Sequence, residues 1–169
     1  MNYNFNLNRF CRLFLKHTAE HYKSYLMSLA VLIGVLVLGG CFLVYMVEAR
    51  LDKNVQSALY MIVLLLSGTI FTSTVLADLG DRKKAIAWLT LPASHFEKYL
   101  VAWLYSLLIF LVVYTASFYL SALFVVSIKH VDGHSYGVLN IFEKRTFEIC
   151  LIYAFLHSVA LYGAVFFER

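Results

Sequence analysis

The stretch YLMSLAVLIGVLVLGGCFLVYMV, residues 25–47, decides the fold because it is long, apolar and free of charged residues. An α-helix rises about 1.5 Å per residue, so about 20 apolar residues cross the hydrocarbon core of a membrane. Three further stretches meet the same test: residues 57–77, 99–128 and 147–167. Unpaired backbone groups are not tolerated in lipid, and the stretches lack the alternating pattern of a membrane barrel. The sequence therefore predicts an all-α membrane protein with four transmembrane helices.

The composition excludes an ordinary soluble domain. Hydrophobic residues make up 62% of the chain and charged residues 14%, whereas a soluble domain averages about 45 to 50% and about 25%. The net charge of +4 comes from short segments beside the apolar stretches, so it gives no reason to expect nucleic-acid binding. The sequence has no phosphate loop of the form GxxxxGKS or GxxxxGKT, which a nucleotide hydrolase of that type needs. We therefore do not expect the chain to be an enzyme.

Residues 1–24 are predicted to form an amphipathic helix that lies in the cytoplasmic membrane interface before the first span. Apolar side chains and one histidine recur at helical spacing: Phe10, Leu13, Phe14 and His17. Four charged residues fall largely around the other face: Arg9, Arg12, Lys16 and Glu20. Asn8 is the expected N-cap. The basic residues are expected to face anionic lipid head groups.

The orientation follows from the Lys and Arg residues on either side of the spans. Nine lie in residues 1–24, the connector 78–98 and the C-terminal end, and five lie on the opposite side. Cytoplasmic segments carry the excess of basic residues. Both termini and the connector are therefore predicted to be cytoplasmic.

The chain divides into two pairs of spans around this connector. Residues 25–77 are predicted to be a hairpin of two transmembrane helices, 25–47 and 57–77, because the link between them is too short for a domain. Residues 99–169 hold the second pair, 99–128 and 147–167. The third stretch exceeds the thickness of the bilayer, so it is expected to tilt or to project from the membrane.

The connector 78–98 carries signals for a short helix followed by a sharp stop. Trp88 and Leu89 fall on one side of this predicted helix, and Pro92 ends it because proline lacks an N–H donor. Ser94 and Glu97 fit a capping box, in which each side chain accepts a hydrogen bond from the backbone N–H of the other residue. The third helix is therefore expected to begin at Ser94.

The segment LADLGDRKKAIAWLTLPASHFEKYLVAWL, residues 76–104, resembles the connector of the short membrane subunits of type-2 ATP-binding-cassette (ABC) exporters. It is most similar to the bacteroidete-like group, which has an LPAS-x-x-EK element after its second span. The topology of nearly the whole chain is similar to that of this family, although only residues 91–98 are distinctive. Type-2 permeases usually have six spans, so this sequence is expected to correspond to the first four.

This resemblance implies a permease subunit of the bacterial inner (plasma) membrane that works with a separate cytoplasmic ATPase. The short helix would be a coupling helix with Trp88 and Leu89 as apolar anchors, and a second permease subunit or a second copy would complete the pathway. Basic residues would set its orientation on the ATPase: Arg82, Lys83 and Lys84. Membrane lipids are the other expected partners, and no cofactor is implied. The alternative is a membrane scaffold or assembly subunit that does not transport.

Four polar or aromatic residues within the spans are candidates for a transport pathway: Tyr105, Tyr114, Tyr119 and His157. Tyrosines at such positions can line an amphipathic cavity, but they more often serve packing. A histidine in a span usually faces protein or a watery cavity. For His157, a hydrogen bond between helices is the favoured interpretation.

Two further groups could in principle bind a metal. HTAEH, residues 17–21, matches the inverted zinc-protease pattern HxxEH, but polar residues on an interfacial helix are the favoured interpretation because no catalytic domain is present. The loop containing His130, Asp132 and His134 offers three ligands in a short segment, which occurs often by chance. No metal site is predicted. The three cysteines (Cys11, Cys41 and Cys150) share no metal-type spacing and are expected to be small packing residues.

Overall fold

The computed structural model describes residues 6–45, 53–76, 94–128 and 143–167 of the chain. In these ranges the elements are the helices α1 (Leu7–Tyr45), α2 (Lys53–Leu76), α4 (His95–Trp103), η2 (Leu104–Ile109), α5 (Phe110–Ile128) and α6 (Lys144–Phe167), and no strand occurs. Because α4, η2 and α5 form one continuous helix, these elements make four helices that are long and apolar enough to cross a membrane. The all-α fold with four membrane-spanning helices is confirmed, and it is consistent with an integral membrane protein.

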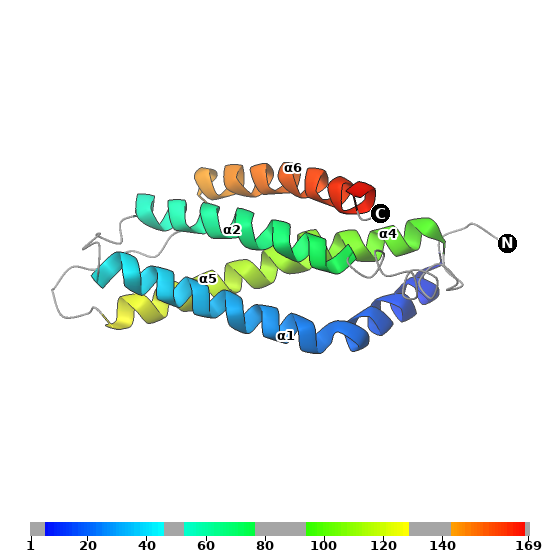
Figure 1. Ribbon diagram of the computed structural model, residues 1–169, viewed down its shortest axis with the longest axis horizontal. Helices are drawn as coiled ribbons and strands as arrows, with labels where there is room; N and C mark the ends of the chain where they lie inside the picture. The colour runs from blue at the N-terminus through cyan, green and yellow to red at the C-terminus, as the bar shows by residue number, and fades with distance from the viewer. Residues whose placement is uncertain (1–5, 46–52, 77–93, 129–142, 168–169) are drawn as a thin grey trace.

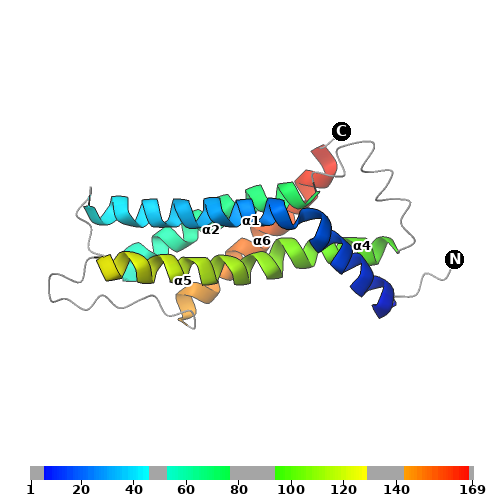
Figure 2. The same ribbon diagram turned by 90° about the horizontal axis from the view of Figure 1, so that it is seen from below.

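The helices associate mainly in two pairs, α1 with α5 and α2 with α6. Figures 1 and 2 show both pairs running lengthwise, while α4 and the N-terminal part of α1 project together beyond the ends of α2 and α6. The main core lies between the pairs and includes the buried aromatic residues Tyr60, Tyr114 and Tyr153. The third helix, which is formed by α4, η2 and α5, packs along α1 and also contacts α2 of the other pair.

The third helix contains one turn of π-helix, for which the sequence gives no signal. It runs without interruption through the 32 residues Phe96–Ser127. Within η2 the backbone hydrogen bonds join residues five positions apart instead of four, and the N–H of Phe110 donates to the carbonyl of Tyr105. Such turns are frequent at functional sites in helical proteins.

The N-terminal helix differs from the prediction because it is not separate from the first span. α1 is continuous for 39 residues. Neither glycine nor proline occurs between Leu7 and Ile33, so nothing ends the helix near Ser24. Figure 2 shows that its dark blue N-terminal part is instead bent toward α4. The N-cap is Asn6 rather than Asn8, because the backbone N–H of Asn8 donates to Asn6 Oδ1 over 3.0 Å.

The apolar face of this N-terminal part packs on protein. Leu13 is buried in one cluster with Val101 and Tyr105 of the third helix, and Phe10 and Phe14 pack against the same cluster. The expectation that this face lies on the membrane is therefore wrong. An apolar stripe in the sequence indicates burial, but it does not distinguish lipid from a neighbouring helix.

The fourth span begins with a charged turn. Glu148 lies within the stretch predicted to cross the membrane, and its carboxylate is 4.0 Å from Lys144 Nζ one turn earlier. Both side chains are exposed. The apolar part of α6 therefore starts after this ion pair.

Candidate functional site

The predicted capping box is present at the start of α4. Ser94 has an extended backbone, with φ −68° and ψ 153°, and its hydroxyl accepts the backbone N–H of Glu97 over 3.1 Å. The carboxylate of Glu97 returns the contact, since Oε2 accepts the backbone N–H of Ser94 over 3.0 Å. The helix therefore has a fixed start within the last residues of the connector.

The same carboxylate also binds the start of α1, 91 residues earlier in the chain. Its second oxygen, Oε1, accepts the backbone N–H of Asn6 over 2.9 Å. Arg9 Nη2 approaches this oxygen to 3.4 Å. One side chain thus holds the N-terminal ends of the first and third spanning helices together; we name Asn6, Arg9, Ser94 and Glu97 the N-terminal junction.

The electrostatics of the N-terminal junction favour an ionised carboxylate. The Glu97 side chain is 0% exposed, and a buried charge is stable only when it is paired and hydrogen-bonded. The first N–H groups of each helix lack partners within the helix, and the helix dipole places partial positive charge there. The carboxylate of Glu97 accepts hydrogen bonds from such N–H groups at two helix starts, and it pairs with the guanidinium of Arg9, which is 38% exposed. A neutral side chain at this position would satisfy fewer of these donors.

An aromatic cluster adjoins the N-terminal junction. The ring of Tyr105 stacks on Phe14 with a centroid separation of 4.8 Å and meets His17 at the same separation. Its hydroxyl forms a hydrogen bond with the Thr18 hydroxyl. His17 Nε2 lies 2.8 Å from the Tyr25 hydroxyl. Tyr105, a predicted pathway residue, therefore joins α1 to the third helix.

The residues predicted to contact an ATPase lie outside the described part of the chain. These are Arg82, Lys83, Lys84, Trp88 and Leu89, and the helix-stopping Pro92 is also outside it. The described chain resumes at Ser94. The N-terminal junction is therefore the described site nearest in sequence to the predicted coupling helix.

A second polar site lies where α2, η2 and α6 meet. His157 is buried, with Nδ1 3.0 Å from Thr72 Oγ1 and Nε2 3.4 Å from Ser106 Oγ. Thr72 donates its hydroxyl proton to the Gly68 carbonyl over 2.8 Å, so its oxygen accepts from Nδ1. The imidazole thus forms the hydrogen bond between helices that the sequence favoured.

Tyr153 strengthens this polar site through the π-helical turn. Its hydroxyl donates to the carbonyl of Ser106 over 3.0 Å. The ring passes so close to α2 that a Cβ added to Gly68 would overlap its Cε2 and lie 3.0 Å from its Cζ. Only glycine at position 68 allows this approach. We name Gly68, Thr72, Ser106, Tyr153 and His157 the mid-helix layer.

The other two predicted pathway residues lie further along α5. Tyr114 is buried and donates to the carbonyl of Tyr60 over 2.8 Å. Tyr119 is partly buried, and its ring is edge-on to Phe118 with centroids 6.5 Å apart. None of the four predicted pathway residues lines the groove described next.

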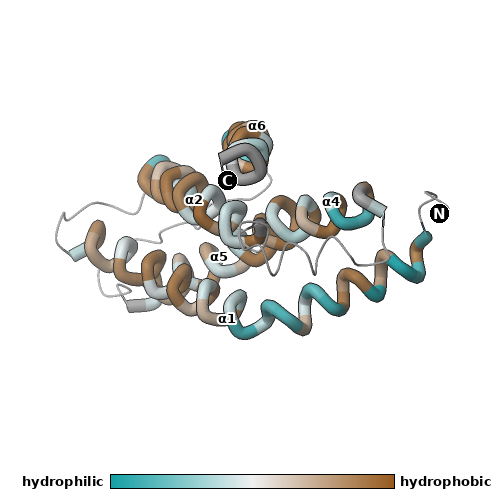
Figure 3. The backbone as a smooth tube through the Cα atoms, turned by 45° about the vertical axis from the view of Figure 1, so that its right-hand side comes forward, coloured by the Kyte–Doolittle hydropathy of each residue, from teal (hydrophilic) through white to brown (hydrophobic). Residues whose placement is uncertain are grey.

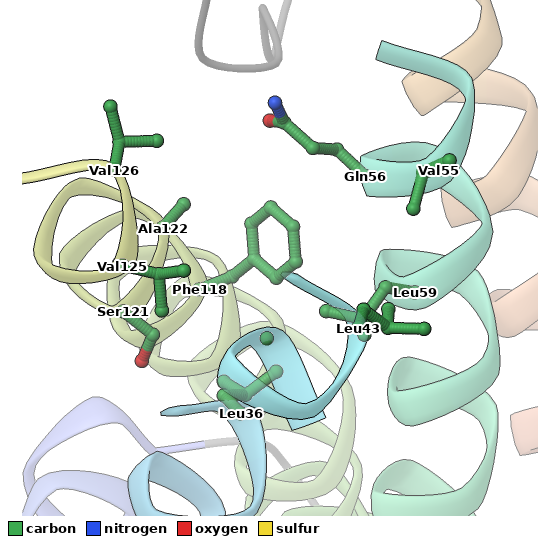
Figure 4. Close-up of a pocket in the computed structure, with 11 residues that line it drawn as sticks. Leu36, Leu43, Val55, Gln56, Leu59, Phe118, Ser121, Ala122, Val125 and Val126 are labelled. Carbon is green, nitrogen blue, oxygen red and sulfur yellow. The ribbon is translucent and has the colours of Figure 1, made fainter. Parts of the chain in front are cut away.

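A mostly apolar groove runs between α1, α2 and α5 (Figure 4). Its walls include Leu43 of α1, Leu59 of α2 and Phe118 of α5, and the polar side chains Gln56 and Ser121 also line it. It lies toward the end of the molecule opposite the N-terminal junction.

The structure describes only one of the two groups that were considered as metal ligands and set aside. In HTAEH, His17 is buried, and His21 Nδ1 lies 3.2 Å from the His17 carbonyl. Among the described residues no three His, Cys, Asp or Glu side chains are grouped to hold a metal. His130, Asp132 and His134 lie outside the described ranges.

The sequence predicted two of the four residues of the N-terminal junction, Ser94 and Glu97. The capping box follows from a local S-x-x-E pattern, but the bonds from Asn6 and Arg9 join residues about 90 positions apart. The only sequence signal for the second half is a basic residue, Arg9, in the first turn of α1. Comparison with known proteins finds no matching family, no matching curated protein and no matching solved structure.

Proposed function

We propose that this chain is the membrane-spanning permease subunit of an ABC-type exporter, in which a separate cytoplasmic ATPase moves the connector 78–98. The proposal rests on the resemblance of residues 76–104 and on one structural observation. At the C-terminal end of the connector, the carboxylate of Glu97 binds the starts of both α1 and α4. A displacement of the connector therefore acts on two spanning helices at once.

The continuous third helix carries such a displacement into the membrane. It spans Phe96–Ser127 and contacts both helix pairs. Tyr105 ties it to α1, and Ser106 and its neighbours tie it to α2 and α6. The two residues are adjacent, so rotation of this one turn would rearrange both sides together. Domain-level switching commonly uses small shifts of packed helices.

The other parts of the proposal follow from composition and resemblance. The excess of basic residues supports a cytoplasmic position for the connector and both termini, and the resemblance supports the bacterial inner membrane. A second permease subunit or a second copy completes the pathway, because four helices enclose little space. Transport requires no cofactor on this chain.

A non-transporting scaffold is the second candidate. It is favoured by the mid-helix layer and by Tyr114, whose polar groups bond to neighbouring helices rather than line the groove. A scaffold would use the connector only to hold a partner. A permease must in addition change the ATP hydrolysis of that partner.

The test is purification of the tagged protein from its native membrane in mild detergent, followed by measurement of ATPase activity that co-purifies. Trp88→Ala with Leu89→Ala is expected to lose this activity. The control is Leu151→Ala with Phe155→Ala, which removes similar apolar volume from exposed positions of α6. This control should keep the ATPase.

Each outcome separates the candidates. An ATPase that stays bound to the connector variant but no longer responds to the membrane subunit supports coupling. An intact parent protein that brings no ATPase overturns the permease proposal. A bound partner without ATPase activity would identify the scaffold.

A further inference from the structure

The N-terminal part of α1 has an exposed outer surface, which the other described helices do not cover. Leu13 and His17 are buried on the inner side. On the outer side a basic stripe at helical spacing is exposed: Arg12, Lys16 and Lys23. Beside it runs a second exposed stripe, which is apolar and aromatic: Leu15, Tyr22 and Leu26. Figure 3 shows the hydrophilic residues concentrated in this part of α1.

Contacts with the third helix show which of its residues lie beside this surface. Arg9 pairs with Glu97, Leu13 packs with Val101, and His17 meets Tyr105. The two helices thus advance together by four residues from one contact to the next. Arg12 and Lys16 therefore lie level with about residues 100–104, where the apolar stretch of the third helix begins.

Aromatic residues also mark this level as the membrane interface. Tyr99 on α4 is exposed at this level, and Trp103 is partly buried. Tyrosine and tryptophan concentrate at the level of the lipid head groups because their rings are amphipathic. Arg12 and Lys16 of the basic stripe consequently lie where lipid phosphates are found.

We propose that Arg12, Lys16 and Lys23 bind the phosphate groups of anionic membrane lipids while Leu15, Tyr22 and Leu26 contact their acyl chains. The charges are complementary, since each basic residue near a membrane surface attracts anionic lipid. Glu20 lies 3.6 Å from Lys16 and offsets one charge of the stripe. The inference does not depend on the proposed transport function.

An acidic protein surface is the other partner that a basic stripe could attract. The apolar stripe favours lipid, because it runs along the same helix directly into the membrane-spanning part of α1. A protein partner would have to cover Leu15 and Leu26 as well as the charges. Lipid covers both without a further interface.

The test compares two substitutions of the same kind. Lys16→Gln removes a lysine that forms an i,i+4 pair with Glu20, and Lys144→Gln removes one that forms an i,i+4 pair with Glu148 at the other end of the molecule. Purified protein is reconstituted into phosphatidylcholine vesicles that contain spin-labelled phosphatidylglycerol or spin-labelled phosphatidylcholine. The immobilised fraction of each label gives the preference for the anionic lipid.

The parent protein should prefer phosphatidylglycerol, and Lys16→Gln should lower that preference by up to about fivefold at low ionic strength. Lys144→Gln should leave it unchanged, and replacement of all three stripe residues by Gln should abolish it. The preference should also fall with added salt. An equal loss in the two lysine variants would show an effect of net charge alone. That result, or a parent protein without preference, would overturn the proposal.

Discussion

The N-terminal junction and the mid-helix layer both hold the third helix, but they use different chemistry. The junction uses one charged carboxylate that accepts backbone N–H groups from the starts of α1 and α4. The mid-helix layer uses hydroxyl groups, an imidazole and a phenol. The hydroxyl protons of Thr72 and Ser106 go to carbonyls of their own helices, and that of Tyr153 goes to the Ser106 carbonyl of the neighbouring helix. The first lies where helices project beyond α2 and α6, and the second lies within the bundle.

This difference shows where the chain can carry a charge. Helix starts supply unpaired N–H groups, so a carboxylate there is stabilised by two helices at once. In the middle of a helix those groups are already paired, and an ionised side chain would lack compensation. Within the bundle, neutral hydrogen bonds therefore join the described helices. The buried carboxylate of Glu97 lies instead at the helix starts beside the connector.

The largest effect is expected from Gly68→Ala in the mid-helix layer. The added methyl would overlap the ring of Tyr153 and force α2 and α6 apart, which should cost about 1 to 3 kcal/mol of unfolding free energy. Gly34→Ala is the control, because no atom outside its own helix lies within 4 Å of the added carbon. Unfolding in mixed micelles measures both variants. Equal stabilities would contradict the close approach of Tyr153.

A smaller effect is expected from the bond between His157 and Thr72. Interhelical hydrogen bonds in membranes contribute on average about 0.6 kcal/mol. A double-mutant cycle with His157→Leu and Thr72→Val should show a coupling energy of this size. Thr115→Val with His157→Leu serves as a control pair, because Thr115 bonds to Tyr60 instead. If the changes in unfolding free energy of His157→Leu and Thr72→Val were additive, the hydrogen bond between the two residues would be contradicted.

The sequence predicted features that depend on neighbouring residues. Four apolar stretches gave the four spans, and the S-x-x-E pattern at Ser94 gave the start of α4. The sequence also suggested a break between an N-terminal helix and the first span near Ser24, and this boundary was wrong. A change from mixed to apolar composition does not end a helix without a breaking residue. The bend in α1 and its packing on Tyr105 depend on a partner 80 to 90 positions away.

The contacts of the candidate site could likewise be predicted only where the partners are close in sequence. Glu97 was identified as a capping residue because its partner Ser94 is three positions away. Its bonds to Asn6 and Arg9 require the folded arrangement of α1 beside α4. The π-helical turn at Ser106 has no sequence signal, since Leu, Tyr, Ser and Ile also suit an ordinary helix.

Hydrogen exchange of backbone amides in the Glu97→Gln variant tests most directly whether one carboxylate joins two helix starts. The neutral side chain keeps its size but can no longer accept as an anion, so the amides of Asn6 and Ser94 should both exchange faster than in the parent. Ser94→Ala is the local comparison: loss of the cap should cost about 1 kcal/mol at α4 and leave the Asn6 amide protected. If Glu97→Gln changed exchange at Ser94 alone, the two helix starts would not share this carboxylate. The proposed coupling through the N-terminal junction would then be contradicted.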